Sequence, residues 1–407
     1  MLTIAEAFAL VIEQAKPLPA EDRPLRESRG CRLAEEVAAD LDQPPFTRSL
    51  VDGFAVRSTD LKGRTTQLTL VETIVAGRMP DRVLQPGEAA AIMTGAPLPP
   101  GADAVVMHED TQRLADQVEI QAKNVQAGQN LQEKGRIYRA GDPILRPGTL
   151  LTTACLALLA SVGRLHARVV PRPRVAIIPT GDELVEPDQV PGPGQIRNSN
   201  AIMLEALVSE HGPAWVSAIA PDEPRTLTEM LGKGLDCDAL VVTGGVSVGE
   251  RDLVPAALLD LEVRQVFHKV RLKPGKPLWF GIGPARGDRP GALVFGLPGN
   301  PASGLVGFLL FIRPALCLLA GHPLPAADTV QARLGNRFVQ KGNRPTYYPA
   351  KLVDQSPANG GGAVIETLAW AGSADLLGIA LADGLAIFPE GDRVFHPGEI
   401  VPFLPLR

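Results

Sequence analysis

Four loops between residues 174 and 301 carry residue types that bind metals and anions. Each follows an apolar run typical of a buried strand, and each contains glycine, carboxylate or both. The loops are Thr180-Gly181-Asp182-Glu183, Pro221-Asp222-Glu223-Pro224, residues 243–252 and residues 296–301. Strands that alternate with helices in one sheet run parallel, so their following loops gather along one edge, where open α/β sheets bind ligands. The acids predict a metal site there, and the glycines predict an anion site.

The third loop is the candidate anion cradle, with the sequence Thr243-Gly244-Gly245-Val246-Ser247-Val248-Gly249. Glycine lets consecutive backbone N–H groups converge on phosphate-like oxygens, and Ser247 adds a hydroxyl donor. The spacing matches neither the GxGxxG dinucleotide fingerprint nor the P-loop. An ordinary turn is the alternative. Glu250 and Asp252 follow at once, and capping of the next helix is an alternative role for Asp252.

Asp182 and Glu183 follow directly after a wholly apolar run, residues 175–178. Adjacent carboxylates at a strand end suit Mg²⁺, a hard cation that takes a few oxygen ligands and completes its shell with phosphate and water. Asp222 and Asp252, in two of the other loops, are the remaining candidate magnesium ligands. A helix N-cap or a solvated loop is the alternative for these acids.

Two lysines stand in a stiffened turn, Lys273-Pro274-Gly275-Lys276-Pro277. Because proline restricts the backbone, the two ammonium groups are held in place, which suits a fixed anion. Surface lysines without a ligand are the alternative.

Asp52 lies far from these loops, in Ser49-Leu50-Val51-Asp52-Gly53-Phe54-Ala55-Val56. From its local sequence it is most simply a turn aspartate before glycine. The six histidines have no ligand spacing and the four cysteines no CxxC pair, so the sequence indicates neither a zinc site nor a disulfide framework.

Length and composition indicate a multidomain globular chain. A length of 407 residues predicts two to four domains. A net charge of −5 gives no general attraction to nucleic acid or anionic membranes. The N-terminus lacks a basic region followed by an apolar one, which argues against a signal peptide. The most apolar stretch, residues 305–320, contains Arg313 and Pro314 and is too short to span a bilayer. We expect a cytoplasmic protein.

Residues 174–322 alternate between strand and helix patterns, which predicts a doubly wound α/β sheet. The expected strands are 175–178, 215–219, 239–242, 263–270 and 292–295, and the expected helices are 200–211, 227–235, 252–261 and 302–319.

Shorter elements flank this core. Residues 1–40 have helical spacing, including Leu33, Ala34, Val37 and Ala38, and residues 150–162 predict a compact helix. The runs 67–75, 89–93, 104–108 and 117–122 predict a small β-rich domain, and the chain after residue 323 predicts a second one.

The ordered motifs resemble those of the bacterial molybdopterin molybdenumtransferases, a family of molybdenum-insertion enzymes related to the catalytic domain of gephyrin. The matches are residues 49–56, Met93-Thr94-Gly95-Ala96-Pro97, residues 101–106, Ala140-Gly141-Asp142, residues 180–184, residues 194–200, residues 243–252, residues 273–277, residues 296–303 and residues 372–377. They cover almost the whole chain in a single order. The sequence departs from the family where Leu50-Val51 and Phe54 replace the usual Ala-Met and Tyr, and it matches only loosely around Arg344.

The resemblance implies a fold and an assembly. The linking domain would comprise residues 1–45 and 141–173, with the N-terminal helix a candidate for packing on the core. Residues 46–140 would form the β-rich inserted domain, residues 174–322 the molybdopterin-binding domain and residues 323–407 a C-terminal β-barrel. The family also implies a homodimer whose site lies between subunits, so that Asp52 completes the partner's cleft.

The resemblance further assigns residue roles. The catalytic residues it implies are Asp52, Thr94, Asp142, Glu183 and Asp252. The pterin-phosphate and oxyanion contacts it implies are Gly244, Gly245, Ser247, Gly249, Lys273, Lys276, Pro298, Asn300 and Pro301, with Arg344 and Ser373 at a molybdate pocket. The carboxylates Asp182, Glu183, Asp222 and Asp252 remain the magnesium candidates, without a division between base and ligand.

The expected reaction inserts molybdate into adenylylated molybdopterin, with magnesium-dependent release of AMP. The substrate brings its own dithiolene sulfurs, so no cysteine cluster is needed. One alternative is a molybdopterin adenylyltransferase, with which this chain would otherwise make transient contact. Another is a non-catalytic assembly scaffold. The sequence leaves open whether molybdate or tungstate is preferred.

Overall fold

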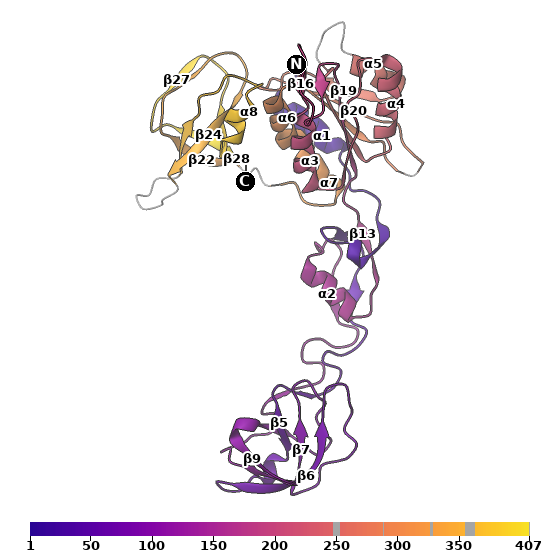
Figure 1. Ribbon diagram of the computed structural model, residues 1–407, viewed down its shortest axis with the longest axis vertical. Helices are drawn as coiled ribbons and strands as arrows, with labels where there is room; N and C mark the ends of the chain where they lie inside the picture. The colour runs from indigo at the N-terminus through magenta and orange to yellow at the C-terminus, as the bar shows by residue number, and fades with distance from the viewer. Residues whose placement is uncertain (247–252, 288, 326–328, 355–362, 407) are drawn as a thin grey trace. The chain divides into compact units, whose positions relative to one another are not determined.

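The computed structural model of the chain describes residues 1–246, 253–287, 289–325, 329–354 and 363–406 (Figure 1). The chain forms two compact units, each with its own buried core. The first unit comprises Met1–Asp22, Gly30–Arg32 and Arg168–Arg407, and the second comprises Arg23–Arg29 and Leu33–Ala167. The chain passes between them within β1 (Glu21–Pro24), β2 (Arg32–Leu33) and β13 (His166–Val170), and also between Arg29 and Gly30.

The first unit is built around a six-stranded sheet with the order β17-β14-β18-β21-β20-β19. Its strands are β14 (Val175–Pro179), β17 (Ala214–Val216), β18 (Ala239–Thr243), β19 (Arg264–His268), β20 (Trp279–Ile282) and β21 (Leu293–Leu297). Its helices are α1 (Ile4–Gln14), α3 (Asn200–Ser209), α4 (Pro224–Gly234), α5 (Leu253–Asp260), α6 (Pro301–Gly307), the π-helical turn η4 (Phe308–Ile312) and α7 (Arg313–Leu319).

Helices cover both faces of this sheet. Successive strand residues point to opposite sides, and in the central strands both sets are largely apolar and buried. In β14, Val175 and Ile177 belong to one apolar cluster with α1, α3 and the α6–α7 segment. Ala176 and Ile178 belong to the other cluster, with α4 and α5. The predicted doubly wound α/β core is therefore confirmed.

Strand β20 was not predicted from the sequence, and it interrupts the parallel direction of the core sheet. The strands β17, β14, β18 and β21 are mutually parallel, but β20 pairs antiparallel with both β21 and β19. The sequence pattern missed β20 because Trp279 and Phe280 are buried on opposite faces, which removes any alternation. The Pro- and Gly-rich segments on either side of it also resemble loops.

The closing helical segment runs from Pro301 to Leu319 without a break in helical structure, but its middle turn, η4, is π-helical. With 19 residues and a mean hydropathy of 2.0, this segment is long and apolar enough to cross a membrane, contrary to the sequence expectation. Its surroundings identify it as a core helix, since 78% of its most apolar 18-residue stretch is buried inside the protein.

The C-terminal part of the first unit is a closed five-stranded barrel, as expected. Its strands are β22 (Val330–Leu334), β24 (Thr346–Asp354), β25 (Val364–Thr367), β26 (Gly384–Phe388) and β28 (Ile400–Pro405). A two-stranded ribbon of β23 (Phe338–Gln340) and β27 (Arg393–Phe395) and the short helix α8 (Leu376–Ala380) accompany it. The short strands β15 (Leu184–Val185) and β16 (Ile196–Arg197) pair beside the core sheet.

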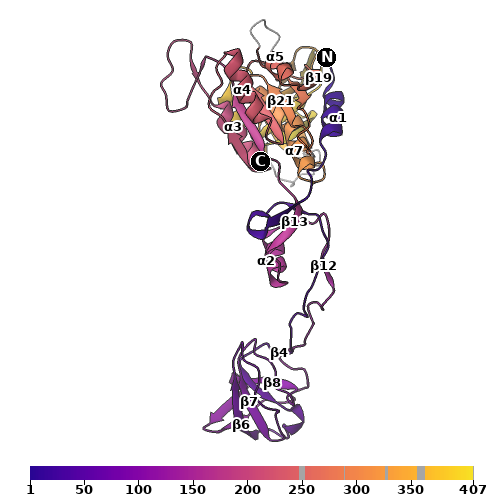
Figure 2. The ribbon, with the colours of Figure 1, turned by 90° about the vertical axis from the view of Figure 1, so that its right-hand side faces the viewer.

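The second unit contains a six-stranded sheet with the order β8-β5-β7-β6-β10-β9. Figure 2 shows β6, β7 and β8 of this sheet. Its strands are β5 (Gly53–Val56), β6 (Thr66–Ile74), β7 (Glu88–Ile92), β8 (Ala104–Met107), β9 (Thr111–Leu114) and β10 (Gln117–Ile120). Shorter elements of this unit are η1 (Leu25–Glu27), β3 (Val37–Ala38), β4 (Arg48–Ser49), η2 (Ser58–Asp60), η3 (His108–Asp110), β11 (Leu131–Gln132), β12 (Pro143–Leu145) and α2 (Thr153–Ser161). The predicted β-rich region is therefore confirmed, with β5 and β9 added.

The helical expectation for Leu33 to Ala38 is wrong. This segment is extended, because its backbone pairs with residues that are distant in sequence. The Leu33 N–H donates to the carbonyl of Thr149, and Val37 pairs with Leu145 across β3 and β12. These pairings override a helical apolar spacing.

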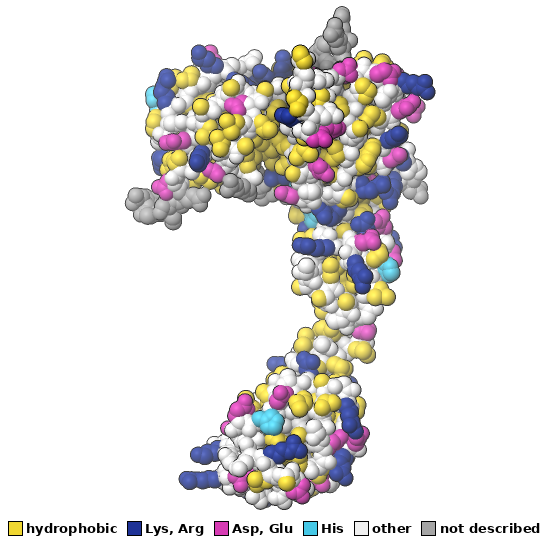
Figure 3. Space-filling view, viewed as in Figure 1, with side chains coloured by type: hydrophobic (Ala, Val, Ile, Leu, Met, Phe, Trp, Pro, Cys, Tyr) yellow, Lys and Arg dark blue, Asp and Glu magenta, His cyan; other side chains and the backbone are white. Residues whose placement is uncertain are grey.

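Charge is distributed evenly over the visible surface. On the face shown in Figure 3, basic and acidic side chains are interspersed over each unit. No single-sign field covers that face of either unit.

Candidate functional site

The carboxyl ends of the parallel core strands meet at one edge of the sheet, as expected. Because β20 runs opposite to both neighbours, β19 points in the same direction as β21. The loops after β14, β17, β18, β19 and β21 therefore all leave from this edge. The glycine loop, the acidic loops and the lysine turn therefore lie along the same edge of the sheet.

The glycine loop begins with two residues in the left-handed region, Gly244 at φ 88° and Gly245 at φ 60°. The Gly244 N–H donates to the carbonyl of Leu297 at 3.0 Å. A Cβ on Gly244 would lie 2.5 Å from the carbonyl oxygen of Thr180. Three strand ends thus meet backbone to backbone, which only glycine permits. Ser247, Gly249 and Asp252 lie outside the described residues.

The acidic loops after β14 and β17 contact each other. The Asp182 Oδ1 accepts the backbone N–H of Asp222 at 3.0 Å, and both side chains are exposed. Glu183 is also exposed, and its carboxylate lies over Gly181, where a Cβ would come within 2.3 Å of Oε2. Glu223, the next acid, instead caps α4 and accepts the N–H groups of Arg225 and Thr226.

The donor chemistry of these acids fits Mg²⁺, because exposed carboxylate oxygens are the ligands that a hard cation takes. Within the described ranges, no three His, Cys, Asp or Glu side chains cluster closely enough to hold a metal alone. The acids therefore fit a cation that fills the rest of its shell with water and phosphate oxygens.

The lysine turn presents exposed side chains on an anchored backbone. Lys273 and Lys276 are both exposed. The Lys273 N–H donates to Pro345, and the Lys273 carbonyl accepts the N–H of Tyr347 at 2.8 Å. The guanidinium of Arg344 donates to the carbonyl of Leu272 at 3.0 Å, so the structure places the predicted Arg344 beside this turn.

The last loop joins the edge to Ser373. Asn300 is the N-cap residue of α6, and Pro301 is its first residue. The Ala302 N–H donates to the carbonyl of Ser373 at 3.1 Å, which brings Ser373 to the start of α6. Pro298 lies in the same connection, after β21.

Asn200 was missed as a site-supporting residue. Its amide Nδ2 donates to the carbonyl of Gly299 at 2.7 Å and so ties the first residue of α3 to the loop before α6. The only sequence signal for Asn200 is its place in the motif of residues 194–200.

In the second unit, Asp52 and Thr94 are directly bonded although 42 positions separate them. The Asp52 Oδ1 accepts both the N–H of Thr94 at 2.6 Å and its hydroxyl at 2.7 Å. Both bonds lower the pKa of Asp52 below its usual value, and the backbone N–H bond has the larger effect. Gly53 is required beside it, because a Cβ there would lie 1.9 Å from the carbonyl oxygen of Val106.

Asp142 hydrogen-bonds Arg139 and Ala39, both in its own unit. Its Oδ2 accepts the N–H of Arg139 at 2.8 Å, and its carbonyl accepts the N–H of Ala39. The structure does not bond Asp142 to Asp52 or Thr94.

His108, to which the sequence analysis assigned no chemistry, lies next to Asp52. Its backbone N–H donates to the Asp52 carbonyl at 3.3 Å, and its ring packs edge-on against Phe54 at 5.0 Å. No sequence signal marks it, because strand pairing creates the contact.

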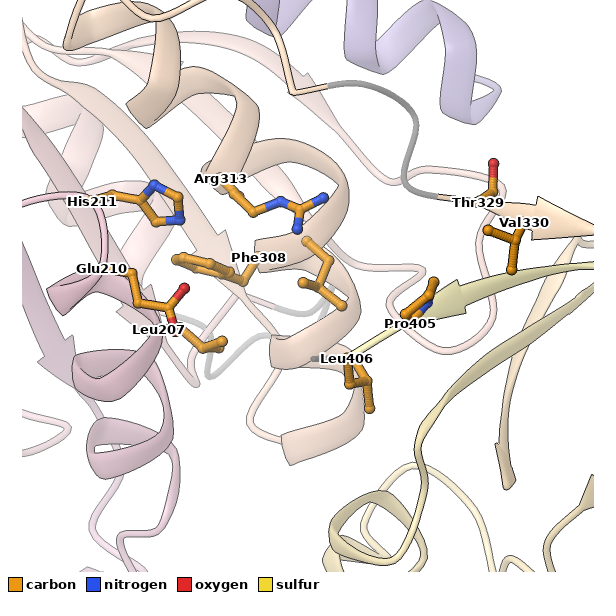
Figure 4. Close-up of a pocket in the computed structure, with 10 residues that line it drawn as sticks. Leu207, Glu210, His211, Phe308, Arg313, Thr329, Val330, Pro405 and Leu406 are labelled. Atoms are coloured by element: carbon orange, nitrogen blue, oxygen red, sulfur yellow. The ribbon is translucent and has the colours of Figure 1, made fainter. Parts of the chain in front are cut away.

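A separate cavity of about 470 Å³ lies in the first unit, between α3, the closing helical segment and the barrel (Figure 4). It is lined by Leu207, Glu210, His211, Phe308, Leu309, Arg313, Thr329, Val330, Pro405 and Leu406. Burial, followed by the charge of Arg313, lowers the pKa of His211 to about 4, so this imidazole is neutral at neutral pH. None of the predicted site residues is among its lining, so this cavity is distinct from the sheet edge.

Three family models cover the chain. The model described as MoeA N-terminal region (domain I and II) matches residues 2–163. The model described as probable molybdopterin binding domain matches residues 176–317, and that described as MoeA C-terminal region (domain IV) matches residues 331–406.

Curated relatives and solved structures match along the full length. The molybdopterin molybdenumtransferase of Staphylococcus aureus is 31% identical over 409 residues, which span 99% of this chain and 95% of the relative. That of Staphylococcus epidermidis is 31% identical over 406 residues, spanning 98% and 94%. A crystal structure of a molybdopterin biosynthesis MoeA protein from Pyrococcus horikoshii aligns with a TM-score of 0.77 and 29% identity, covering 100% of this chain and 99% of that one. With this identity and coverage, the chain belongs to the molybdopterin molybdenumtransferase family of transferases in molybdenum cofactor biosynthesis.

Proposed function

We propose that this chain inserts molybdate into adenylylated molybdopterin and releases AMP in a magnesium-dependent reaction. The observation that carries the proposal is the convergence of the glycine loop, the exposed lysines and the exposed acids at one sheet edge. The phosphate oxygens of the substrate suit the glycine loop and the lysines. The cation bound to those phosphates suits the acids.

The anionic substrates would be held by backbone and side-chain donors. In this proposal the loop that starts at Gly244 and Gly245 receives the phosphates, and Lys273 and Lys276 neutralise them. Arg344, anchored beside the lysine turn, and Ser373 would contact molybdate. Such preorganised donors stabilise charge that develops during bond cleavage.

The acids would serve a different purpose. Asp182, Glu183 and Asp222 would hold Mg²⁺, which supplies Lewis-acid polarisation of the phosphate when it is bound. Asp252 and Ser247 are included on the family resemblance alone. Asp52, fixed by Thr94, would position the water or oxyanion at the adenylyl bond.

We further propose that the active enzyme is a cytoplasmic homodimer. Asp52 belongs to the second unit and the sheet edge to the first. In this proposal Asp52 of one subunit completes the cleft of the other. The adenylylated substrate would be received in transient contact with the adenylyltransferase that makes it.

The direct test supplies the purified chain with adenylylated molybdopterin, molybdate and Mg²⁺ and measures AMP. We expect AMP release by the wild type. Lys276→Ala should lower kcat/KM on the order of tenfold, because a charge-assisted phosphate contact is removed. Lys351→Ala is the matched control, since Lys351 is an exposed lysine on barrel strand β24. If both variants match the wild type, the lysine turn does not bind substrate.

Two other activities would give different results in the same assay. A molybdopterin adenylyltransferase would consume ATP with free molybdopterin and release no AMP from the adenylylated form. A non-catalytic scaffold would bind adenylylated molybdopterin without turnover. Either result would refute the proposed insertion reaction.

A further inference from the structure

Three strand ends of the second unit meet at Asp52. In the sheet, Gly53 of β5 pairs with Ile92 of β7 on one side and with Met107 of β8 on the other. Thr94 follows shortly after Ile92, and His108 follows Met107 directly. Asp52 therefore lies between Thr94 on one neighbouring strand end and His108 on the other.

Thr94 occupies only one side of the Asp52 carboxylate. Both of its hydrogen bonds reach Oδ1, and across the described chain no other residue hydrogen-bonds Oδ2. The carboxylate is exposed. Oδ2 is therefore the carboxylate oxygen that a neighbouring charge or a substrate can approach.

His108, which follows the neighbouring strand β8, is fixed by backbone and ring contacts. Its N–H bond to the Asp52 carbonyl sets the backbone, and the edge-on contact with buried Phe54 sets the ring. The close approach of Gly53 to Val106 keeps β5 and β8 together at this point. A protonated His108 favours the ionised form of Asp52 by Coulomb attraction, although less than Thr94 does.

We propose that His108 is a positioning residue of the Asp52–Thr94 pair, which balances the charge of the Asp52 carboxylate where it faces an anionic substrate. A carboxylate that approaches phosphate or molybdate oxygens is repelled unless a proton donor or cation stands beside it. His108 supplies that group from the start of η3, directly after β8. The charged groups on its own helical turn, Glu109 and Asp110, are acidic. This inference rests on the proposed function for the identity of the anion, but not for the coupling of the two side chains.

The coupling is tested without any substrate by following the ¹³C NMR titration of Asp52, assigned with Asp52→Asn. Histidine is protonated at the acidic pH where carboxylates titrate. His108→Gln should therefore shift the Asp52 titration to higher pH, whereas His108→Lys, which keeps a positive charge, should not. His396→Gln, at an exposed histidine of the first unit, is the matched control and should leave the titration unchanged. An Asp52 titration that is identical in wild type and His108→Gln would overturn the inference.

The functional consequence is tested by AMP release. His108→Gln should lower kcat about twofold to fivefold, the usual size of an exposed charge interaction, with KM for adenylylated molybdopterin unchanged. His108→Lys should restore kcat. If the wild type releases AMP and both variants equal it, His108 has no such role although the proposed function stands. If the wild type releases no AMP, the proposed function fails, and the NMR titration still decides the coupling.

Discussion

At the scale of single residues, the bond between Asp52 and Thr94 sets the charge state of the predicted catalytic carboxylate. The two Thr94 bonds hold the folded pKa of Asp52 below its ordinary value of 3.8. A lowered carboxylate pKa contributes stability that is present above the unfolded pKa and is lost as the pH falls through the folded pKa. This contribution to stability is therefore lost progressively as the pH falls from the ordinary pKa of aspartate towards the lower folded pKa of Asp52.

Removing the Thr94 hydroxyl should move this titration. In Thr94→Val the backbone bond remains and the hydroxyl bond is lost, so the pKa of Asp52 should rise toward its ordinary value. The acid limb of the pH–rate profile for AMP release should then shift to higher pH. Thr94→Ser, which keeps the hydroxyl, is the control and should retain the wild-type profile. Identical acid limbs in Thr94→Val and Thr94→Ser would contradict this role of the hydroxyl.

At the scale of secondary-structure elements, the start of the glycine loop depends on close backbone packing between strand ends. Gly244 has φ 88°, and a Cβ on it would meet the Thr180 carbonyl oxygen at 2.5 Å. Gly194 has a similar φ of 83° with no atom within 4 Å of its Cβ position. Gly244→Ala should therefore destabilise the protein by about 1–3 kcal/mol more than Gly194→Ala does, through overpacking. Comparison of the two thermal unfolding midpoints checks this. Equal midpoints would show that the backbone around Gly244 can shift to accommodate a Cβ without loss of stability.

The elements also show what could be predicted from the sequence. The edge formed by the loops after β14, β17, β18 and β21 was predictable, because strand–helix alternation fixes the direction of successive parallel strands. Strand β20 was not predictable, because its residues are buried on both faces and its sequence shows no alternation of apolar and polar residues. The extended segment around Leu33 was also not predictable, since its hydrogen-bond partners lie more than a hundred positions away. The Asp52–Thr94 pair was predicted only through the family resemblance, and the neighbouring His108 not at all, because strand register alone brings them together.

At the scale of the whole molecule, the proposed site draws on both compact units. Asp52 and Thr94 belong to the second unit, and Lys276 and Glu183 to the first. If one subunit supplies Asp52 and its partner supplies the sheet edge, each site of a homodimer combines residues from two chains. The assembly is then testable by complementation between two variants that are each impaired alone.

We expect Asp52→Ala and Lys276→Ala, each impaired alone, to recover activity when unfolded and refolded together. A mixed dimer pairs the intact Asp52 of one chain with the intact Lys276 of the other at one of its two sites. Random pairing makes half of the dimers mixed, so about one quarter of wild-type AMP release should return. As a control, two variants of the same unit, Lys273→Ala and Lys276→Ala, should not complement, because every site then contains one altered lysine turn. Recovery that fails for the first pair while the refolded dimers are intact would place Asp52 and the sheet edge of each site within one chain.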